Sequence, residues 1–183
     1  MNKLKTLVGM TALLASGMPM LAQHGHAASP HISINAVVDG DSLTLVYGSP
    51  SVKDPKSGEP RKIWGKLVPY GKVWRTGADE ATLLTTEKTL VLGETTLAPG
   101  TYSLWTLPAE DGSAKLVINK QTGQWGTRYD EAQDLARVDL KKESLECPAG
   151  RFTMAIERGS GGGGVLKMMW ETTAYSIPFT VKK

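Results

Sequence analysis

Apolar and polar residues alternate along much of this chain. In residues 31–38, Ile32, Ile34, Ala36 and Val38 fall on one face and polar residues fall on the other. This alternation has the period of a half-buried β-strand. No segment sustains the longer period of an amphipathic helix, so the pattern predicts an all-β protein. Further strands are expected at residues 42–47, 81–87, 89–92, 101–107, 115–119, 134–140, 151–158, 165–171 and 175–181.

Turn-forming residues separate these segments. Asp39-Gly40 predicts a tight hairpin turn after the first strand, and the glycine-rich run 159–164 predicts a flexible connection. Pro178 lacks a backbone N–H and suggests that the last strand lies at a sheet edge. Roughly nine or ten short strands with turns at this spacing predict a single-domain antiparallel β-sandwich, with a distorted barrel as the alternative.

Two irregular segments, residues 61–82 and 120–132, interrupt the alternation. Both combine glycine, aromatic residues and charged residues in no clean period. Three evenly spaced glycines in the first segment favour a structured loop, because glycine readily adopts turn conformations closed to other residues. We expect Trp64 and Trp74 to anchor this loop to the core, because large apolar side chains are stabilised by burial.

Residues 1–28 have the layout of a secretory signal peptide, with two lysines, an apolar run at 7–14 and small residues at the end. Cleavage is expected near Ala22 or Ala28, which leaves one β-sandwich domain at 29–183. The apolar run is too short to span a bilayer, and no cysteine near the cut could accept a lipid. The sequence therefore predicts a periplasmic or secreted protein without a membrane span after cleavage.

The amino-acid composition argues against several partners and kinds of site. The formal charge of +3 falls to +1 when the two lysines of the predicted signal peptide are removed, which argues against a nucleic-acid partner. Cys147 is the only cysteine and cannot form an internal disulfide. The histidines are His24, His26 and His31, so the body of the domain lacks the usual zinc ligands. The run 159–164 precedes a strand rather than a helix, which disfavours dinucleotide binding. We expect no metal, no cofactor and no catalytic residue.

The two irregular segments also carry the candidate site. Arg75 follows Trp74 and precedes Asp79 and Glu80, and an arginine can hold a carboxylate through two parallel hydrogen bonds. These residues fit an internal ion-pair network that fixes the loops, and they also fit a ligand site. The candidate ligand-binding residues, which we expect to cluster, are Trp74, Arg75, Glu80, Trp125, Tyr129, Asp134 and Arg137.

Three functions remain compatible with these observations. The leading hypothesis is a non-catalytic exported domain that binds an unknown small molecule, glycan or envelope protein through the two irregular segments. One alternative is a hydrolase acting on an envelope glycan or ester, with Glu80 and Asp134 as acid and base. The other is a purely structural domain with a buried network of arginines and carboxylates. The sequence favours a binding protein over an enzyme.

Three motifs resemble one bacterial family. They are GKLVPYGKVWRTGADEAT, APGTYSLWTLP and QWGTRYDEAQDLARV, in this order. Together they resemble the domain of unknown function 2911, from about Ser29 to the C-terminus. The resemblance implies an exported, mostly β domain with no assigned activity. The chain departs from the family pattern in three places: Asp79 stands where Asn is usual, Ala114 lies where the family often has Trp, and DPKSGEP lengthens the loop before Arg61.

Overall fold

The structure is a computed structural model that describes residues 29–182. These residues form nine β-strands and one short 3-10 helix. The predicted signal peptide at 1–28 lies outside the described residues. Among residues 29–182, no helix has the length and apolar character needed to cross a bilayer. The elements are β1 (His31–Val38), β2 (Asp41–Gly48), β3 (Thr82–Thr86), β4 (Leu90–Leu92), β5 (Thr95–Leu97), β6 (Gly100–Pro108), β7 (Ala114–Asn119), η1 (Glu131–Gln133), β8 (Asp134–Arg158) and β9 (Gly164–Val181).

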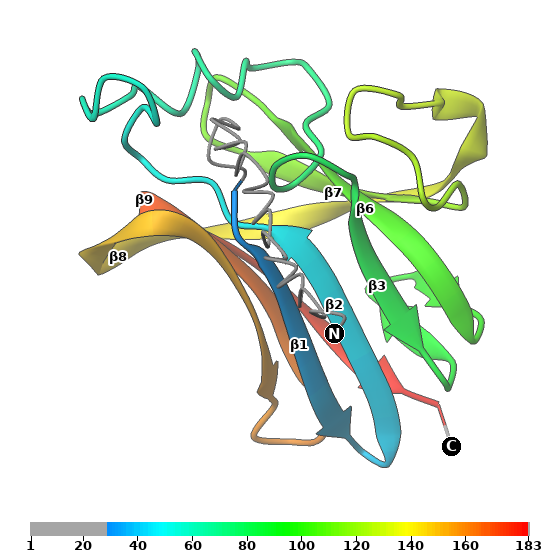
Figure 1. Cartoon of the computed structure of the whole chain (residues 1–183). Helices are drawn as coiled ribbons and strands as arrows, with labels where there is room; N and C mark the ends of the chain where they lie inside the picture. Colours follow the sequence, from blue (N-terminus) through cyan, green and yellow to red (C-terminus); the bar gives the residue numbers. More distant parts are fainter. Residues whose placement is uncertain (1–28, 183) are drawn as a thin grey trace, which may run out of the picture.

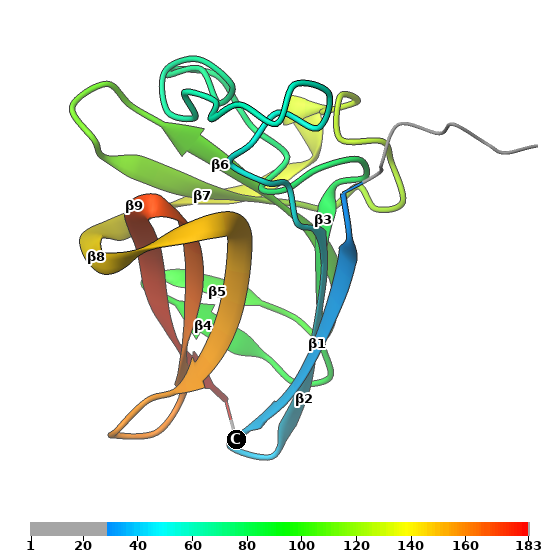
Figure 2. The same ribbon diagram turned by 60° about the vertical axis from the view of Figure 1, so that its left-hand side comes forward.

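All nine strands belong to one antiparallel sheet in the order β1-β2-β3-β6-β7-β8-β9-β4-β5. The sheet is not closed into a barrel. Figures 1 and 2 show that it curls over, so that β1, β2 and β3 face β8, β9 and the β4–β5 hairpin. The predicted all-β antiparallel sandwich is confirmed, and both of its layers come from a single curled sheet.

Two strands are longer than the sequence pattern suggests, with 25 residues in β8 and 18 in β9. β8 pairs first with β7 and then with β9. The β8–β9 register shifts on both sides of Ala149, and Glu171 opposite it adopts a φ of 51°. Such irregularities bend a strand without ending it. The polar residues 141–150 conceal this continuity in the sequence. The predicted strands that merge are 134–140 with 151–158 in β8, and 165–171 with 175–181 in β9.

The edge position predicted from Pro178 is wrong. β9 lies between β8 and β4 in the sheet. Pro178 falls between Ser176, which pairs with β8, and Thr180, which pairs with β4. An interior strand therefore accommodates this proline because it lies outside both ladders, where no strand partner needs its missing N–H.

The hairpin predicted at Asp39-Gly40 is confirmed. Asp39 has a φ of 48° and Gly40 a φ of 74°, and positive φ at both central residues is what a type I′ hairpin turn requires. The turn sets the register of β1 on β2, with Val38 opposite Asp41. This register places Leu43 and Leu45 in the core, as their alternation predicts.

The core fills the space between the facing halves of the sheet. Leu43 of β2 and Leu84 of β3 line the same small apolar space as Leu166 and Phe179 of β9. Fully burying a side chain of this size contributes about 1.5–3 kcal/mol. Contacts between the two halves therefore hold the curled sheet closed and give its loop-bearing end a rigid base.

The connections at residues 49–81 and 120–133 lie at the same end of the sheet (Figures 1 and 2). The first is tied to β6 by two backbone hydrogen bonds between Trp74 and Thr106, each 2.8 Å long. Trp64 and Trp74 pack against the core, which confirms that they anchor the loop. An irregular segment is thus held in place by the regular sheet beneath it.

Candidate functional site

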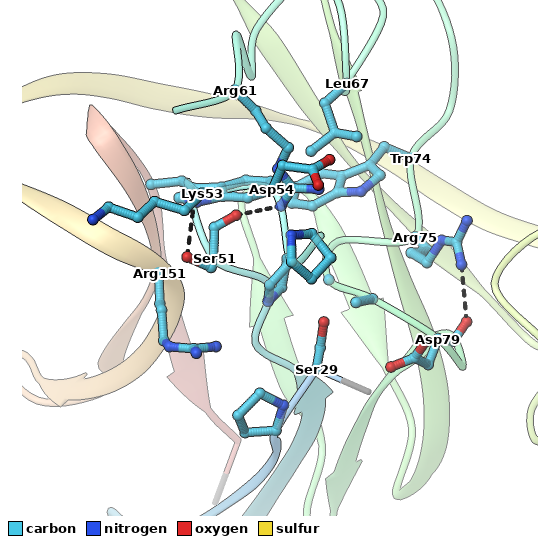
Figure 3. Close-up of a pocket in the computed structure, with 16 residues that line it drawn as sticks. Ser29, Ser51, Lys53, Asp54, Arg61, Leu67, Trp74, Arg75, Asp79 and Arg151 are labelled. Atoms are coloured by element: carbon cyan, nitrogen blue, oxygen red, sulfur yellow. Dashed lines mark hydrogen bonds between the residues drawn. The ribbon is translucent and has the colours of Figure 1, made fainter. Parts of the chain in front are cut away.

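A pocket of about 580 Å³ opens at the loop-bearing end of the sheet. The segments 50–55, 61–67 and 74–79 contribute to its lining, together with Arg151 of β8 and Trp170 of β9 (Figure 3). Its volume lies within the range of about 300–1,000 Å³ that is usual for small-molecule sites. The first irregular segment of the sequence therefore forms one wall of a concave site.

An aromatic wall supports this pocket. The rings of Trp74 and Trp170 stack with their centroids 5.6 Å apart and their planes 19° apart. Phe152 meets Trp74 edge-on at 5.0 Å and Trp170 at 5.8 Å. Each such pair contributes about 0.5–1.5 kcal/mol beyond its buried area. The indole N–H of Trp170 is buried and has no hydrogen-bond partner among the described residues. The wall is thus rigid and apolar, with one unused donor.

Three arginines around the pocket are held by backbone carbonyl groups rather than by carboxylates. Arg75 donates to the carbonyl of Asp79 at 3.1 Å, and Arg151 donates to that of Ser49 at 3.0 Å. Arg61 donates to the carbonyl of Ser51. None of the ion pairs within residues 29–182 involves any of the three. The guanidinium groups are therefore held in place without forming an ion pair, although the charge of Arg61 helps to lower the pKa of Asp54.

The carboxylates of the pocket do not balance this charge. Asp54 accepts backbone N–H groups from Lys56 and Ser57, which lower the pKa of its carboxyl. The Oδ2 atom of Asp79 is buried and has no hydrogen-bond partner among residues 29–182. With Lys53, four cationic side chains face these two carboxylates, which leaves a net charge of +2. Figure 3 shows Arg151 and Lys53 on one side of the pocket, and Arg75 and Asp79 on the other.

The segment 75–79 has an unusual backbone. Thr76 has a φ of 52° and Asp79 a φ of 65°. A β-branched residue at positive φ is an outlier, and each such residue costs about 1–3 kcal/mol. The Oγ1 atom of Thr76 shares a 2.7 Å hydrogen bond with Thr106, and the hydroxyl of Thr82 donates to the Thr76 carbonyl at 2.7 Å. The surroundings thus impose a conformation that the segment would not adopt alone, as is common at ligand sites.

Two glycines allow this segment to pack closely. A Cβ on Gly48 would lie 2.2 Å from the carbonyl oxygen of Ala78, and one on Gly126 would lie 2.3 Å from Cδ of Arg75. Gly126 also donates its N–H to the carbonyl of Asp79 at 2.9 Å. β2 and the second irregular segment therefore hold the 75–79 segment from two sides.

The structure divides the seven predicted site residues among three places. Trp74 and Arg75 line the pocket. Tyr129, Asp134 and Arg137 form a separate group, here called the Tyr129 cluster. Glu80 and Trp125 lie at the surface, apart from both. Within residues 29–182, no hydrogen bond or ion pair joins Arg75 to Glu80, Asp134 or Arg137, so the seven do not form one network.

The Tyr129 cluster is internally satisfied. Asp134 accepts hydrogen bonds from Asn119 at 2.8 Å, from Tyr129 at 2.6 Å and from Arg137 at 2.9 and 3.0 Å. Arg137 also pairs with Glu131 at 2.6 Å. Burial and the bond to Asp134 raise the pKa of Tyr129 to about 12, and the bond to Asp134 raises the pKa of Arg137. The cluster fastens residues 120–133 to β8, which is a structural role.

Glu80 and Trp125 lie on the exposed side of the loops. Oε2 of Glu80 lies 2.7 Å from Nε2 of His31, and this hydrogen bond lowers the pKa of the glutamate. Both side chains are about half exposed, and exposed ion pairs contribute little stability. Trp125 is 46% exposed, and its backbone bridges to that of Glu80.

Sequence reasoning left several pocket residues out of the candidate site. Arg61 comes before the tryptophans of the first irregular segment. Arg151 lies far along the chain, at the start of a predicted strand (151–158) that the sequence did not connect with 134–140. Trp170 is a core residue by its alternation, and nothing in the sequence marks it as a pocket wall. Within the described part of the chain, no group of three or more His, Cys, Asp and Glu side chains is placed to hold a metal ion.

Comparison with known proteins assigns the chain to a family by sequence. No curated protein and no solved structure matches it. The profile of one family, described as "Protein of unknown function (DUF2911)", matches residues 29–179. This range includes all of the pocket-lining residues and the whole Tyr129 cluster. The chain therefore belongs to the DUF2911 family.

Proposed function

We propose that this protein is a non-catalytic domain that binds a small anionic molecule in the pocket. The observation that carries this proposal is the set of Arg61, Arg75 and Arg151, whose guanidinium groups are positioned by backbone carbonyls and have no carboxylate partner among the described residues. Charges gathered in this way repel one another unless an anion neutralises them.

Arginine suits this role for geometric reasons. Its planar guanidinium group offers five N–H donors, and each pocket arginine uses one donor on a carbonyl. The remaining donors can bind a carboxylate or a phosphate in a bidentate manner. All three arginines line one pocket, Arg61 and Arg75 from the 49–81 connection and Arg151 from β8, so a single ligand can contact more than one of them.

The export of the domain remains part of the proposal. Its support is the layout of residues 1–28, which lie outside the described residues. An exported binding protein would meet its ligand in the cell envelope or outside the cell. Sequencing the N-terminus of the protein isolated from a periplasmic or culture fraction would test this, with an uncleaved cytoplasmic chain as the contrary result.

The alternatives have less support. Glu80 pairs with His31, whereas the carboxylate of Asp134 accepts hydrogen bonds from Asn119, Tyr129 and Arg137. An acid–base pair must meet across one cleft, and neither Glu80 nor Asp134 lines the pocket. The purely structural alternative suits the Tyr129 cluster but does not account for the unpaired arginines of the pocket.

The test is calorimetry with simple anions at low ionic strength. We expect the purified protein to bind at least one of citrate, phosphate and cyclohexanecarboxylate. Affinity should fall as salt is added, because screening weakens exposed charge pairs. Arg151→Gln should weaken binding about tenfold, since a hydrogen bond to a charged group contributes about 1.5–3 kcal/mol.

Arg128→Gln is the matched control. Arg128 is exposed and does not line the pocket, and its replacement changes the net charge equally. Its binding should match that of the unmodified protein. The proposal is overturned if none of the three anions binds, or if the two variants lose affinity equally.

A further inference from the structure

We propose that the bound anion is an acidic carbohydrate, meaning a hydroxylated sugar ring that carries a carboxylate. This inference rests on the proposed function and names the ligand class for the same pocket. A simple anion would leave two features of the pocket unused, namely the carboxylate of Asp79 and the apolar surface around Trp74. The inference is argued from these two features.

Asp79 calls for a donor. Its Oδ2 atom is buried in the pocket wall without a hydrogen-bond partner among residues 29–182. A buried acceptor without a donor costs about 1–3 kcal/mol. Rotation about the Cβ–Cγ bond of an aspartate is soft, so either oxygen can turn to the pocket. An anion without N–H or O–H groups can only repel this carboxylate, whereas a hydroxyl group can donate to it.

The pocket wall also contains unused donors. Nε of Arg61 and Nε1 of Trp170 are buried and lack acceptors among the described residues. Both residues line the same pocket as Asp79. The pocket wall therefore has both an acceptor and donors without partners. A ligand with several hydroxyl groups can satisfy both kinds, because each hydroxyl donates one hydrogen bond and can accept two.

An apolar surface accompanies these polar groups. Leu67 is 42% exposed at the pocket, and Trp74, Pro30 and Pro50 share the lining. Figure 3 shows Leu67 close to Trp74, on the opposite side of the pocket from Ser29. The C–H face of a sugar ring buries apolar area against such a surface, as its hydroxyl groups point outward from the ring.

These features together discriminate between ligand classes. The arginines require a negative charge, Asp79 requires a hydroxyl donor, and Trp74 with Leu67 requires a ring face. A neutral sugar lacks the charge, and a plain cyclic carboxylate lacks the hydroxyls. A sugar acid of the uronic type has all three.

The test compares three probes of similar ring size: D-glucuronate, cyclohexanecarboxylate and D-glucose. Binding to the purified protein is measured by calorimetry and by ligand-observed nuclear magnetic resonance. We expect glucuronate to bind about tenfold more tightly than cyclohexanecarboxylate, because charge-assisted hydrogen bonds are the strong ones. Glucose should bind more weakly than glucuronate.

Asp79→Asn sharpens the test. Asparagine adopts positive φ readily, so the backbone at 79 is preserved. Removing the negative charge should improve cyclohexanecarboxylate binding, while the weaker neutral hydrogen bond should reduce the advantage of glucuronate. Asp54→Asn is the matched control, because Asp54 lines the same pocket but already accepts two backbone N–H groups. This control variant should bind glucuronate and cyclohexanecarboxylate more tightly by the same factor, so that the ratio of the two affinities is unchanged.

The outcomes separate this inference from the proposed function. Equal binding of glucuronate and cyclohexanecarboxylate, with an unchanged ratio in Asp79→Asn, overturns the sugar assignment and leaves anion binding intact. Glucose binding as tightly as glucuronate overturns the requirement for charge, and with it the proposed function. Failure of both carboxylates to bind overturns the sugar assignment, and it overturns the proposed function as well if citrate and phosphate also fail to bind.

Discussion

Arg137 and Arg151 lie on the same strand, β8, and have opposite surroundings. Arg137 near the start of the strand is bonded to Asp134, Glu131 and Tyr129. Arg151, farther along, contacts the Ser49 carbonyl and belongs to no ion pair among the described residues. An arginine that fixes the fold is therefore recognised by its carboxylate partners, whereas one with donors left for a ligand lacks them, and the polarity of the surrounding sequence does not separate the two cases.

The backbone repeats this contrast. Around the Tyr129 cluster, side chains stabilise ordinary conformations: Asp130 caps η1 by accepting the N–H of Ala132 at 3.0 Å. In the pocket wall, the fold holds Thr76 and Asp79 at positive φ. One region uses its polar groups to stabilise the fold, while the other depends on the fold to hold its polar groups in place.

Loss of the central carboxylate of the Tyr129 cluster should lower the stability of the protein more than any other change proposed here. Asp134→Ala removes the acceptor shared by Asn119, Tyr129 and Arg137, and its side chain is only 13% exposed. We expect it to lower the free energy of unfolding by about 2–4 kcal/mol, measured by urea denaturation. The control, Asp139→Ala, removes a carboxylate from the same strand that is 85% exposed. It should cost less than about 1 kcal/mol, and equal losses would contradict the assigned structural role.

A smaller effect is expected where the pocket wall depends on close packing. Gly48→Ala places a Cβ against the Ala78 backbone and should cost about 1–3 kcal/mol in unfolding free energy. It should also weaken anion binding, because the 75–79 segment must shift. Gly150→Ala, which meets nothing within 4 Å, should stay within about 0.5 kcal/mol of the unmodified protein. Full anion affinity in Gly48→Ala would show that the position of this segment is immaterial.

The smallest effect concerns pH. The pKa of Tyr129 is raised from 10.0 to about 12, so the folded state retains the phenol proton longer than the unfolded state. This contribution to stability is complete below pH 10 and is lost as the pH rises towards 12. Tyr129→Phe should therefore show a shallower fall in unfolding free energy over this interval, measured by denaturation at successive pH values. An unchanged slope would mean that Tyr129 titrates alike in both states.

The fold was largely predictable because its strands follow a local rule. Alternation in β1 and β2 and the turn at Asp39-Gly40 depend on neighbours in sequence, so they are visible in the chain itself. The continuity of β8 across residues 141–150 was not visible, because that stretch gains its strand structure from pairing with β9 rather than from an apolar face. The edge position inferred from Pro178 was wrong for a related reason, because strands distant in sequence determine where β9 lies in the sheet.

The site was predictable only in part. The segment around Trp74 and Arg75 was identified from its irregular composition, and both residues line the pocket. The separation of Glu80 from its neighbour Asp79 could not be foreseen, because positive φ at Asp79 changes the course of the chain between them. Arg151 of β8 joins the pocket through the curl of the sheet, and Arg61 joins it through its hydrogen bond to Ser51 within the 49–81 connection, and no short motif encodes either contact.

The place of the β4–β5 hairpin has a consequence for how the chain assembles. The hairpin lies between β3 and β6 in sequence, yet its partner in the sheet is the end of β9. During synthesis, β4 therefore emerges long before the residues that cover its edge. Pairings of such long sequence separation slow folding. This half of the sheet therefore closes only after β9 has been made, so the pairing of β4 is a late step in folding.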